Sequence, residues 1–134
     1  MWIIVLLLAI FAILYSIRNL WKTSGTNSFF SLSNLVLLSL VYLTVLIAFG
    51  LGYFVLEEIG FLVLKEHGNA ITVNPRETVG TTMYFSAITL FSVGYGDITP
   101  IGFGRFIAVI EALIGYTLPF AFVARIVTEH DKRD

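Results

Sequence analysis

A short glycine-rich hexapeptide, Ser-Val-Gly-Tyr-Gly-Asp at positions 92–97, separates two apolar segments of the chain. Backbone that is neither helical nor part of a closed sheet is tolerated at membrane depth only where protein covers it or where it lines an aqueous path. An extended segment offers consecutive carbonyl oxygens, and an ion that sheds its water needs several oxygens at once. The hexapeptide therefore predicts an ion-binding segment.

Each residue type in this hexapeptide suits that role. Gly94 and Gly96 can adopt left-handed backbone conformations that let successive carbonyls point the same way. The Ser92 hydroxyl adds an oxygen at the inner end, and the Asp97 carboxylate adds negative charge at the outer mouth. One chain cannot surround an ion, so a closed ring of identical chains is required. The predicted ion-binding residues are Ser92, Val93, Gly94, Tyr95 and Gly96, with the Val93 and Tyr95 side chains turned outward as braces.

The composition indicates a membrane protein. Hydrophobic residues make up 57% of the 134 residues and charged residues only 13%, whereas about a quarter of a soluble domain is charged. A net charge of -1 without a basic stripe excludes a nucleic-acid partner. The chain has no cysteine, and the isolated His67 and His130 cannot form a zinc site alone.

The apolar segments predict how the lipid bilayer is crossed. We expect a first transmembrane helix over 1–22, a cytoplasmic linker over 23–31 and an outer helix over 32–56, about 37 Å long. An exposed outer loop over 57–79 follows, in which the apolar residues Gly60 to Leu64 either continue the helix or lie at the interface.

The segment over 80–91 is about 16 Å long as a helix, which is half a span. Its carbonyl end would point toward the membrane centre, where the helix dipole stabilises a cation. We expect an inner helix over 103–127 and a cytoplasmic tail over 128–134. Lysine and arginine favour an outer N-terminus, which makes Arg18, Lys22, Arg125, Lys132 and Arg133 cytoplasmic and leaves Lys65, Arg76 and Arg105 outside.

The sequence from Thr89 to Asp97, Thr-Leu-Phe-Ser-Val-Gly-Tyr-Gly-Asp, resembles the potassium-channel signature, which is usually Thr-x-x-Thr-Val-Gly-Tyr-Gly-Asp. The resemblance covers about 32–127 and leaves out the first span. It implies an all-α membrane protein with three transmembrane helices, a re-entrant pore helix (80–91) and an extended selectivity filter (92–97, called the filter below). It further implies a homotetrameric, passive, potassium-selective pore in a prokaryotic cell membrane, with K⁺ ions in the filter and no organic cofactor.

The chain departs from that family pattern at two positions. Ser92 replaces the usual threonine, which predicts persisting potassium selectivity with weaker occupancy of the innermost ion site. Ile88 stands where some family members have a glutamate that braces the aspartate behind the filter, so that brace is absent here. Tyr84 and Phe85 match the family's aromatic cuff, or else they are ordinary packing. The predicted filter support comprises Tyr84, Phe85, Ile88, Thr89 and Glu111.

The predicted inner helix carries an ionisable residue within a span, Glu111. Such residues usually face protein or water and often mark function. One hypothesis is that Glu111 reaches pore-helix hydroxyls such as Ser86 or Thr89 and braces the filter from behind. The alternative is a protonated, hydrogen-bonded structural glutamate without a role in gating.

Two further residues predict a bend in the inner helix. Gly115 weakens the helix locally, and Pro119 has no amide hydrogen for the Gly115 carbonyl, so we expect a gating hinge. The alternative is that both residues permit close helix packing. Helical spacing predicts that the residues lining the cavity are Ala112, Tyr116 and Val123.

The rival functions are an intramembrane enzyme, a weakly selective cation channel and an accessory subunit. No Gly-x-Ser-x-Gly, His-Glu-x-x-His or paired membrane aspartates occur, so an intramembrane enzyme is excluded. The first span lacks regularly spaced arginines, so we expect no voltage sensor of the usual kind. A weakly selective cation channel, which commonly lacks the tyrosine at position 95, and an accessory subunit of another channel remain as alternatives.

Overall fold

A computed structural model of the chain describes residues 15, 18, 32–71 and 74–131. The elements in chain order are α2 (Leu32–Glu58), β1 (Leu64–Glu66), β2 (Asn69–Ala70), α3 (Pro75–Leu90), β3 (Ile98–Pro100) and α4 (Gly104–Asp131). Apart from Tyr15 and Arg18, which are helical, the first predicted span lies outside the described residues, as do the predicted linker and residues 132–134.

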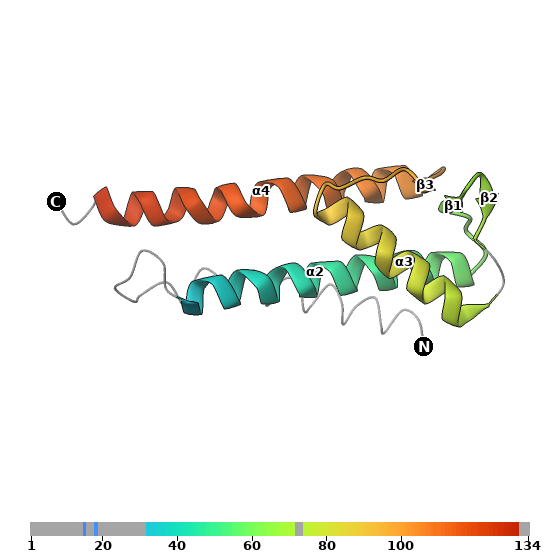
Figure 1. Ribbon diagram of the computed structural model, residues 1–134, viewed down its shortest axis with the longest axis horizontal. Coiled ribbons are helices and arrows are strands. Elements are labelled where there is room, and N and C mark those ends of the chain that lie inside the picture. The colour runs from blue at the N-terminus through green and yellow to red at the C-terminus, as the bar shows by residue number, and fades with distance from the viewer. Residues whose placement is uncertain (1–14, 16–17, 19–31, 72–73, 132–134) are drawn as a thin grey trace.

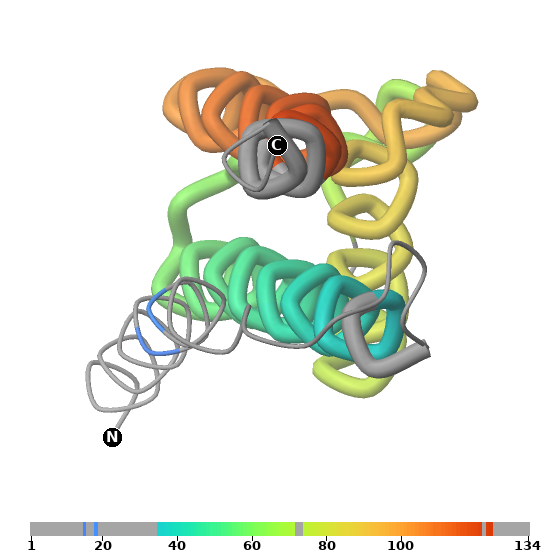
Figure 2. Tube along the Cα trace, turned by 90° about the vertical axis from the view of Figure 1, so that its left-hand side faces the viewer, coloured from blue at the N-terminus to red at the C-terminus, as the bar shows by residue number. Residues whose placement is uncertain are grey.

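The long helices α2 and α4 run along the length of the molecule, and the shorter α3 begins near the end that carries the strands and slants between them toward the middle (Figure 1). Seen end-on, α3 bridges the two long helices along one side (Figure 2). It packs against both α2 and α4, which make few contacts with each other. The position of α3 therefore determines how the two long helices are held together.

Two of these helices are long and apolar enough to cross a membrane, over Leu35–Glu58 and Gly104–Ala121. The 16 residues of α3 are too few to cross. Two full spans with a half-span between them is the arrangement that the apolar segments predict for 32–127. The observed ends of the long helices differ from the predicted ends by at most four residues.

The predicted start of the pore helix is wrong, because α3 begins at Pro75 rather than at residue 80. Asn74 caps the helix: its side-chain oxygen accepts a hydrogen bond from the Arg76 amide at 3.3 Å. Pro75 occupies the first helical turn, where its missing amide hydrogen is not needed, and Glu77 complements the helix dipole. The Asn-Pro-Arg-Glu sequence is a legible helix-start signal within the predicted outer loop.

The all-α prediction is also wrong in one respect, because a small antiparallel sheet of order β2-β1-β3 lies at one end of the molecule. Lys65 pairs with Ala70 on one side and with Thr99 on the other. Strands of two or three residues are too short to show a period in the sequence. The sheet joins the segment after the filter to the segment after α2.

Residues 60–64 do not continue the first long helix, as one reading of this segment expected. Gly60 has a φ of +89°, and the Phe61 amide donates to the Leu56 carbonyl at 2.9 Å. This is the Schellman arrangement that ends helices. The Glu57 carboxylate then accepts the amides of Val63 and Leu64, both at 2.8 Å, and so ties the end of α2 to the start of β1.

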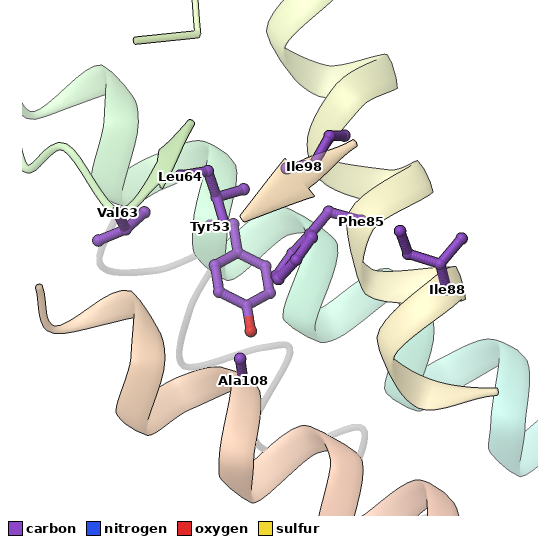
Figure 3. Close-up of a cluster of buried hydrophobic side chains, with 7 residues drawn as sticks. All are labelled: Tyr53, Val63, Leu64, Phe85, Ile88, Ile98 and Ala108. Atoms are coloured by element: carbon purple, nitrogen blue, oxygen red, sulfur yellow. The ribbon is translucent and has the colours of Figure 1, made fainter. Parts of the chain in front are cut away.

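A buried apolar cluster joins the elements at the outer end (Figure 3). The Tyr53 ring of α2 meets the Phe85 ring of α3 edge-on, with centroids 5.1 Å apart. The cluster comprises Tyr53, Val63, Leu64, Phe85, Ile88, Ile98 and Ala108. A second cluster of Val41, Val45 and Leu90 lies between α2 and the end of α3. Together these contacts hold the carbonyl end of α3, where the filter begins.

Candidate functional site

The backbone of the filter alternates in hand. The φ angles of Ser92, Gly94 and Gly96 are 57°, 55° and 80°, and Val93 and Tyr95 between them do not have positive φ. Alternating left- and right-handed residues gather amide hydrogens on one side of a chain and carbonyl oxygens on the other. Glycine adopts the left-handed form at little cost, whereas a residue such as serine needs surrounding support.

The end of α3 provides this support through backbone carbonyls. The amides of Val93 and Gly94 donate to the Ile88 carbonyl at 2.8 and 3.1 Å, and the Ser92 amide donates to the Thr89 carbonyl at 3.0 Å. Ile88 thus supports the filter with its main chain, while its side chain is buried in the outer cluster. The first three amides of the filter are therefore held by the end of α3.

The filter side chains are exposed in a single chain. Val93 is 50% and Tyr95 is 73% exposed, although both side chains are large and largely apolar. Exposed apolar surface of this kind in a membrane protein faces lipid or a neighbouring chain.

At the last residue of the filter, the predicted mouth, the Tyr84 hydroxyl donates a hydrogen bond to Asp97 Oδ2 at 2.9 Å. The His67 amide, in the turn between β1 and β2, donates to the Asp97 carbonyl at 3.0 Å. The hairpin formed by β1 and β2 therefore also holds the mouth. Tyr84, one turn before Ile88, therefore braces Asp97. The apolar Ile88 side chain has no group that could form this hydrogen bond.

The two predicted cuff residues play different parts. Tyr84 faces the mouth, whereas Phe85 is buried in the outer cluster against Tyr53. Phe85 therefore takes the packing role that was one of the two readings for this pair.

We expect Tyr84→Phe to loosen the mouth of the filter, because it removes the hydrogen bond that the half-exposed Asp97 carboxylate accepts. Such a hydrogen bond contributes about 1 kcal/mol to stability. The variant should unfold at a lower temperature in detergent and should discriminate less between K⁺ and Na⁺ in a reversal-potential measurement. Wild-type values for both quantities would show that this hydrogen bond does not hold the mouth.

The inner helix α4 is continuous through Gly115 and Pro119. A Cβ atom placed on Gly115 would collide with the Leu90 carbonyl at the end of α3. Gly115 therefore allows the close packing that was the alternative to a hinge. The hinge role of these two residues stays a prediction.

A hydroxyl from α2 serves the carbonyl that Pro119 leaves without its helical partner. In a regular helix the amide of residue 119 would donate to the carbonyl of residue 115, and proline has no amide hydrogen. The Tyr42 hydroxyl donates to the Gly115 carbonyl at 2.7 Å instead. The Tyr42 ring also stacks on Phe91, the residue before the filter, at 5.4 Å between centroids.

The predicted cavity residues share one side of α4 with other exposed side chains. Tyr116 is 62% and Val123 is 58% exposed, and Ala112 is half-buried at the edge of this face. The exposed residues at 109, 113, 116, 120 and 123 follow one another at intervals of three or four, as one helical face requires, and Ala112 lies beside them, one turn before Tyr116. The other exposed residues of this face are Val109, Leu113 and Phe120.

Glu111 is fully buried and reaches two hydroxyls. Glu111 Oε1 lies 2.5 Å from Ser86 Oγ, so Ser86, one of the two predicted partners, is hydrogen-bonded to Glu111. The second partner is the Tyr53 hydroxyl, at 2.9 Å from Oε2, which sequence reasoning missed. Figure 3 shows the Tyr53 hydroxyl directed from the cluster toward α4.

Three residues that position the site were missed: Tyr42, Tyr53 and Glu57. The tyrosines read as apolar residues of a span, but a tyrosine buried in an apolar helix usually has a hydrogen-bond partner, which is a usable signal. Glu57 marks the end of α2 in the sequence, although nothing in the sequence tells which amides it accepts.

Comparison with known proteins found one matching family and two similar sequences. A family model described as an ion channel matches residues 40–130. The chain belongs to this ion channel family. It is 40% identical to protein LctB of Bacillus caldotenax over 123 residues, 90% of this chain and 91% of that protein. It is 38% identical to protein LctB of Geobacillus stearothermophilus over 122 residues, with the same coverage.

No solved structure matches the chain significantly. Family membership makes the protein a membrane ion channel and not an enzyme. The two candidate spans and the helix between them agree with a pore-domain fold.

Proposed function

We propose that this chain forms a potassium-selective channel in which four copies surround one axis and the filter carbonyls replace the water around K⁺. The alternating hand of the backbone at Ser92, Gly94 and Gly96 carries the proposal, since it allows a row of carbonyls to face one side. Four such rows supply the several oxygens that a dehydrated ion needs. The proposed ligands are the carbonyl oxygens of the filter and the Ser92 hydroxyl.

The position of α3 supports a cation rather than an anion. Its carbonyl end meets the filter directly and places partial negative charge there. Asp97 at the other end of the filter adds a carboxylate at the mouth. The proposed topology, with the hairpin outside and the end of α4 in the cytoplasm, places this mouth on the outer face.

Flux through purified protein in liposomes tests the proposal. We expect K⁺ uptake that exceeds Na⁺ uptake and that barium blocks. Equal K⁺ and Na⁺ fluxes would instead favour a weakly selective cation channel. Liposomes without flux would favour an accessory subunit that needs another channel.

The serine at position 92 leads to a sharper prediction. Ser92→Thr adds one methyl group beside the innermost ion site, and packing of one methyl group contributes about 0.8 kcal/mol, or about fourfold in selectivity. We expect the selectivity of Ser92→Thr for K⁺ over Na⁺, measured by reversal potential, to exceed that of the wild type by about that factor. An unchanged ratio would mean that the packing around position 92 does not limit selectivity.

A further inference from the structure

A chain of hydrogen bonds crosses the three described helices behind the filter. It runs from Glu111 on α4 to Ser86 on α3 and on to the Leu46 carbonyl of α2, which lies 2.9 Å from Ser86 Oγ. Tyr53 of α2 closes it from the other side at Glu111 Oε2. The side chains of Glu111, Ser86 and Tyr53 are all fully buried.

The number of hydrogens in this chain determines the charge of Glu111. Three oxygen-to-oxygen contacts need three hydrogens, and the hydroxyls of Tyr53 and Ser86 supply two. An ionised Glu111 has none to give, so the Ser86 hydroxyl would have to leave either Leu46 or Glu111. A neutral Glu111 supplies the third hydrogen by donating to Ser86, and every contact is then satisfied.

The surroundings of Glu111 also favour the neutral acid. Among the described residues that contact it, α2 contributes Tyr53 as an ionisable group, and α3 contributes the non-ionising hydroxyl of Ser86. The strand β3, which packs on α4, consists of Ile-Thr-Pro and has no ionisable side chain. A buried carboxylate without a cation partner is expensive in an apolar environment.

The chain of hydrogen bonds bears directly on the filter. Ser86 lies two residues before Ile88, whose carbonyl holds the amides of Val93 and Gly94. One turn beyond Glu111, Gly115 packs on the Leu90 carbonyl. A shift of Ser86 away from Glu111 or Leu46 would therefore move the end of α3 that holds the filter.

We infer that Glu111 is a positioning residue that holds the filter as a neutral carboxylic acid, and that removing its proton at alkaline pH lowers conduction. The inference rests on the proposed channel function and adds its regulation. The acid keeps α2, α3 and α4 in register while it carries its proton. When the pH rises far enough to ionise it, one hydrogen bond is lost and an unpaired charge is left in apolar surroundings, which is unfavourable.

K⁺ flux through purified wild-type and variant proteins in liposomes tests this inference. The flux is measured from about pH 6 to about pH 10, a range that reaches the usual pKa of tyrosine. Wild-type K⁺ flux should be constant at the acidic end and fall by about tenfold at the alkaline end. Glu111→Gln should conduct like the wild type at the acidic end without the alkaline fall, because its amide donates to Ser86 and its carbonyl accepts from Tyr53. Glu58→Gln, at an exposed glutamate of α2, is the matched control and should keep the wild-type profile.

Infrared spectroscopy provides a readout that does not depend on conduction. The wild type minus Glu111→Gln difference spectrum at neutral pH should contain the carbonyl stretch of a protonated carboxylic acid. In the wild type this band should disappear with the same midpoint as the flux. Absence of the band, or an alkaline fall retained in Glu111→Gln, would overturn the inference. Wild-type liposomes without selective K⁺ flux would contradict the proposed function alone, since the infrared band would still report on Glu111.

Discussion

Gly115→Ala is expected to destabilise the channel by about 3 kcal/mol and to abolish most K⁺ flux. The added Cβ atom would overlap the Leu90 carbonyl and lie 3.1 Å from the Leu90 Cα atom. Because these are main-chain atoms, no rotamer change can relieve the overlap, and α4 must move away from the end of α3. That movement separates the inner helix from the turn that holds the filter.

Gly52→Ala is the matched control for this experiment. Gly52 lies in α2, and a Cβ atom there would meet nothing within 4 Å in the described chain. Both variants gain the same helix propensity, about 1 kcal/mol, so their difference isolates the contact with Leu90. Thermal unfolding in detergent and K⁺ flux in liposomes provide the two measurements.

The same pair of variants distinguishes the two readings of Gly115. Packing predicts a lower unfolding temperature for Gly115→Ala than for Gly52→Ala. A hinge without tight packing predicts altered flux and an unfolding temperature at least as high as that of the control. Equal behaviour of the two variants in both measurements would contradict the role of the Leu90 contact.

Tyr42→Phe is expected to cost about 1 kcal/mol in the wild-type background and almost nothing when Pro119 is replaced by alanine. The phenylalanine removes the donor that serves the Gly115 carbonyl. Pro119→Ala restores an amide hydrogen at the position that normally serves the same carbonyl. The two substitutions should therefore be strongly non-additive.

A double-mutant cycle on the free energy of unfolding measures this coupling, with an expected value of about 1 kcal/mol. The stacking of ring 42 on Phe91 is preserved in Tyr42→Phe, so the cycle reports on the hydroxyl. Additive effects of the two substitutions would show that Tyr42 does not replace the missing amide. A fall in K⁺ flux that follows the same coupling would link the hydrogen bond at the Gly115 carbonyl to the base of the filter.

Local features of the sequence predicted much of the candidate site. The glycines of the filter and Glu111 within a span stood out in the sequence for a local reason. Irregular backbone and an ionisable side chain are both unfavourable at membrane depth, wherever the rest of the chain lies. The sequence named Ser86 and Thr89 as alternative partners of Glu111, and the structure shows the contact with Ser86. The start of α3 was legible in Asn74 to Glu77, although the surrounding polar residues suggested a loop.

The sequence alone determined that the chain has two long apolar segments around a half-span and a glycine-rich segment, because length, hydrophobicity and backbone freedom are properties of local sequence. Only the tertiary structure decided which side chains brace that segment. The hydroxyls of Tyr42 and Tyr53 meet partners 73 and 58 positions away. The strand β3 after the filter pairs with β1, which precedes α3. Such pairings depend on how α3 packs between α2 and α4, and close packing is a property of the whole fold that no single segment carries.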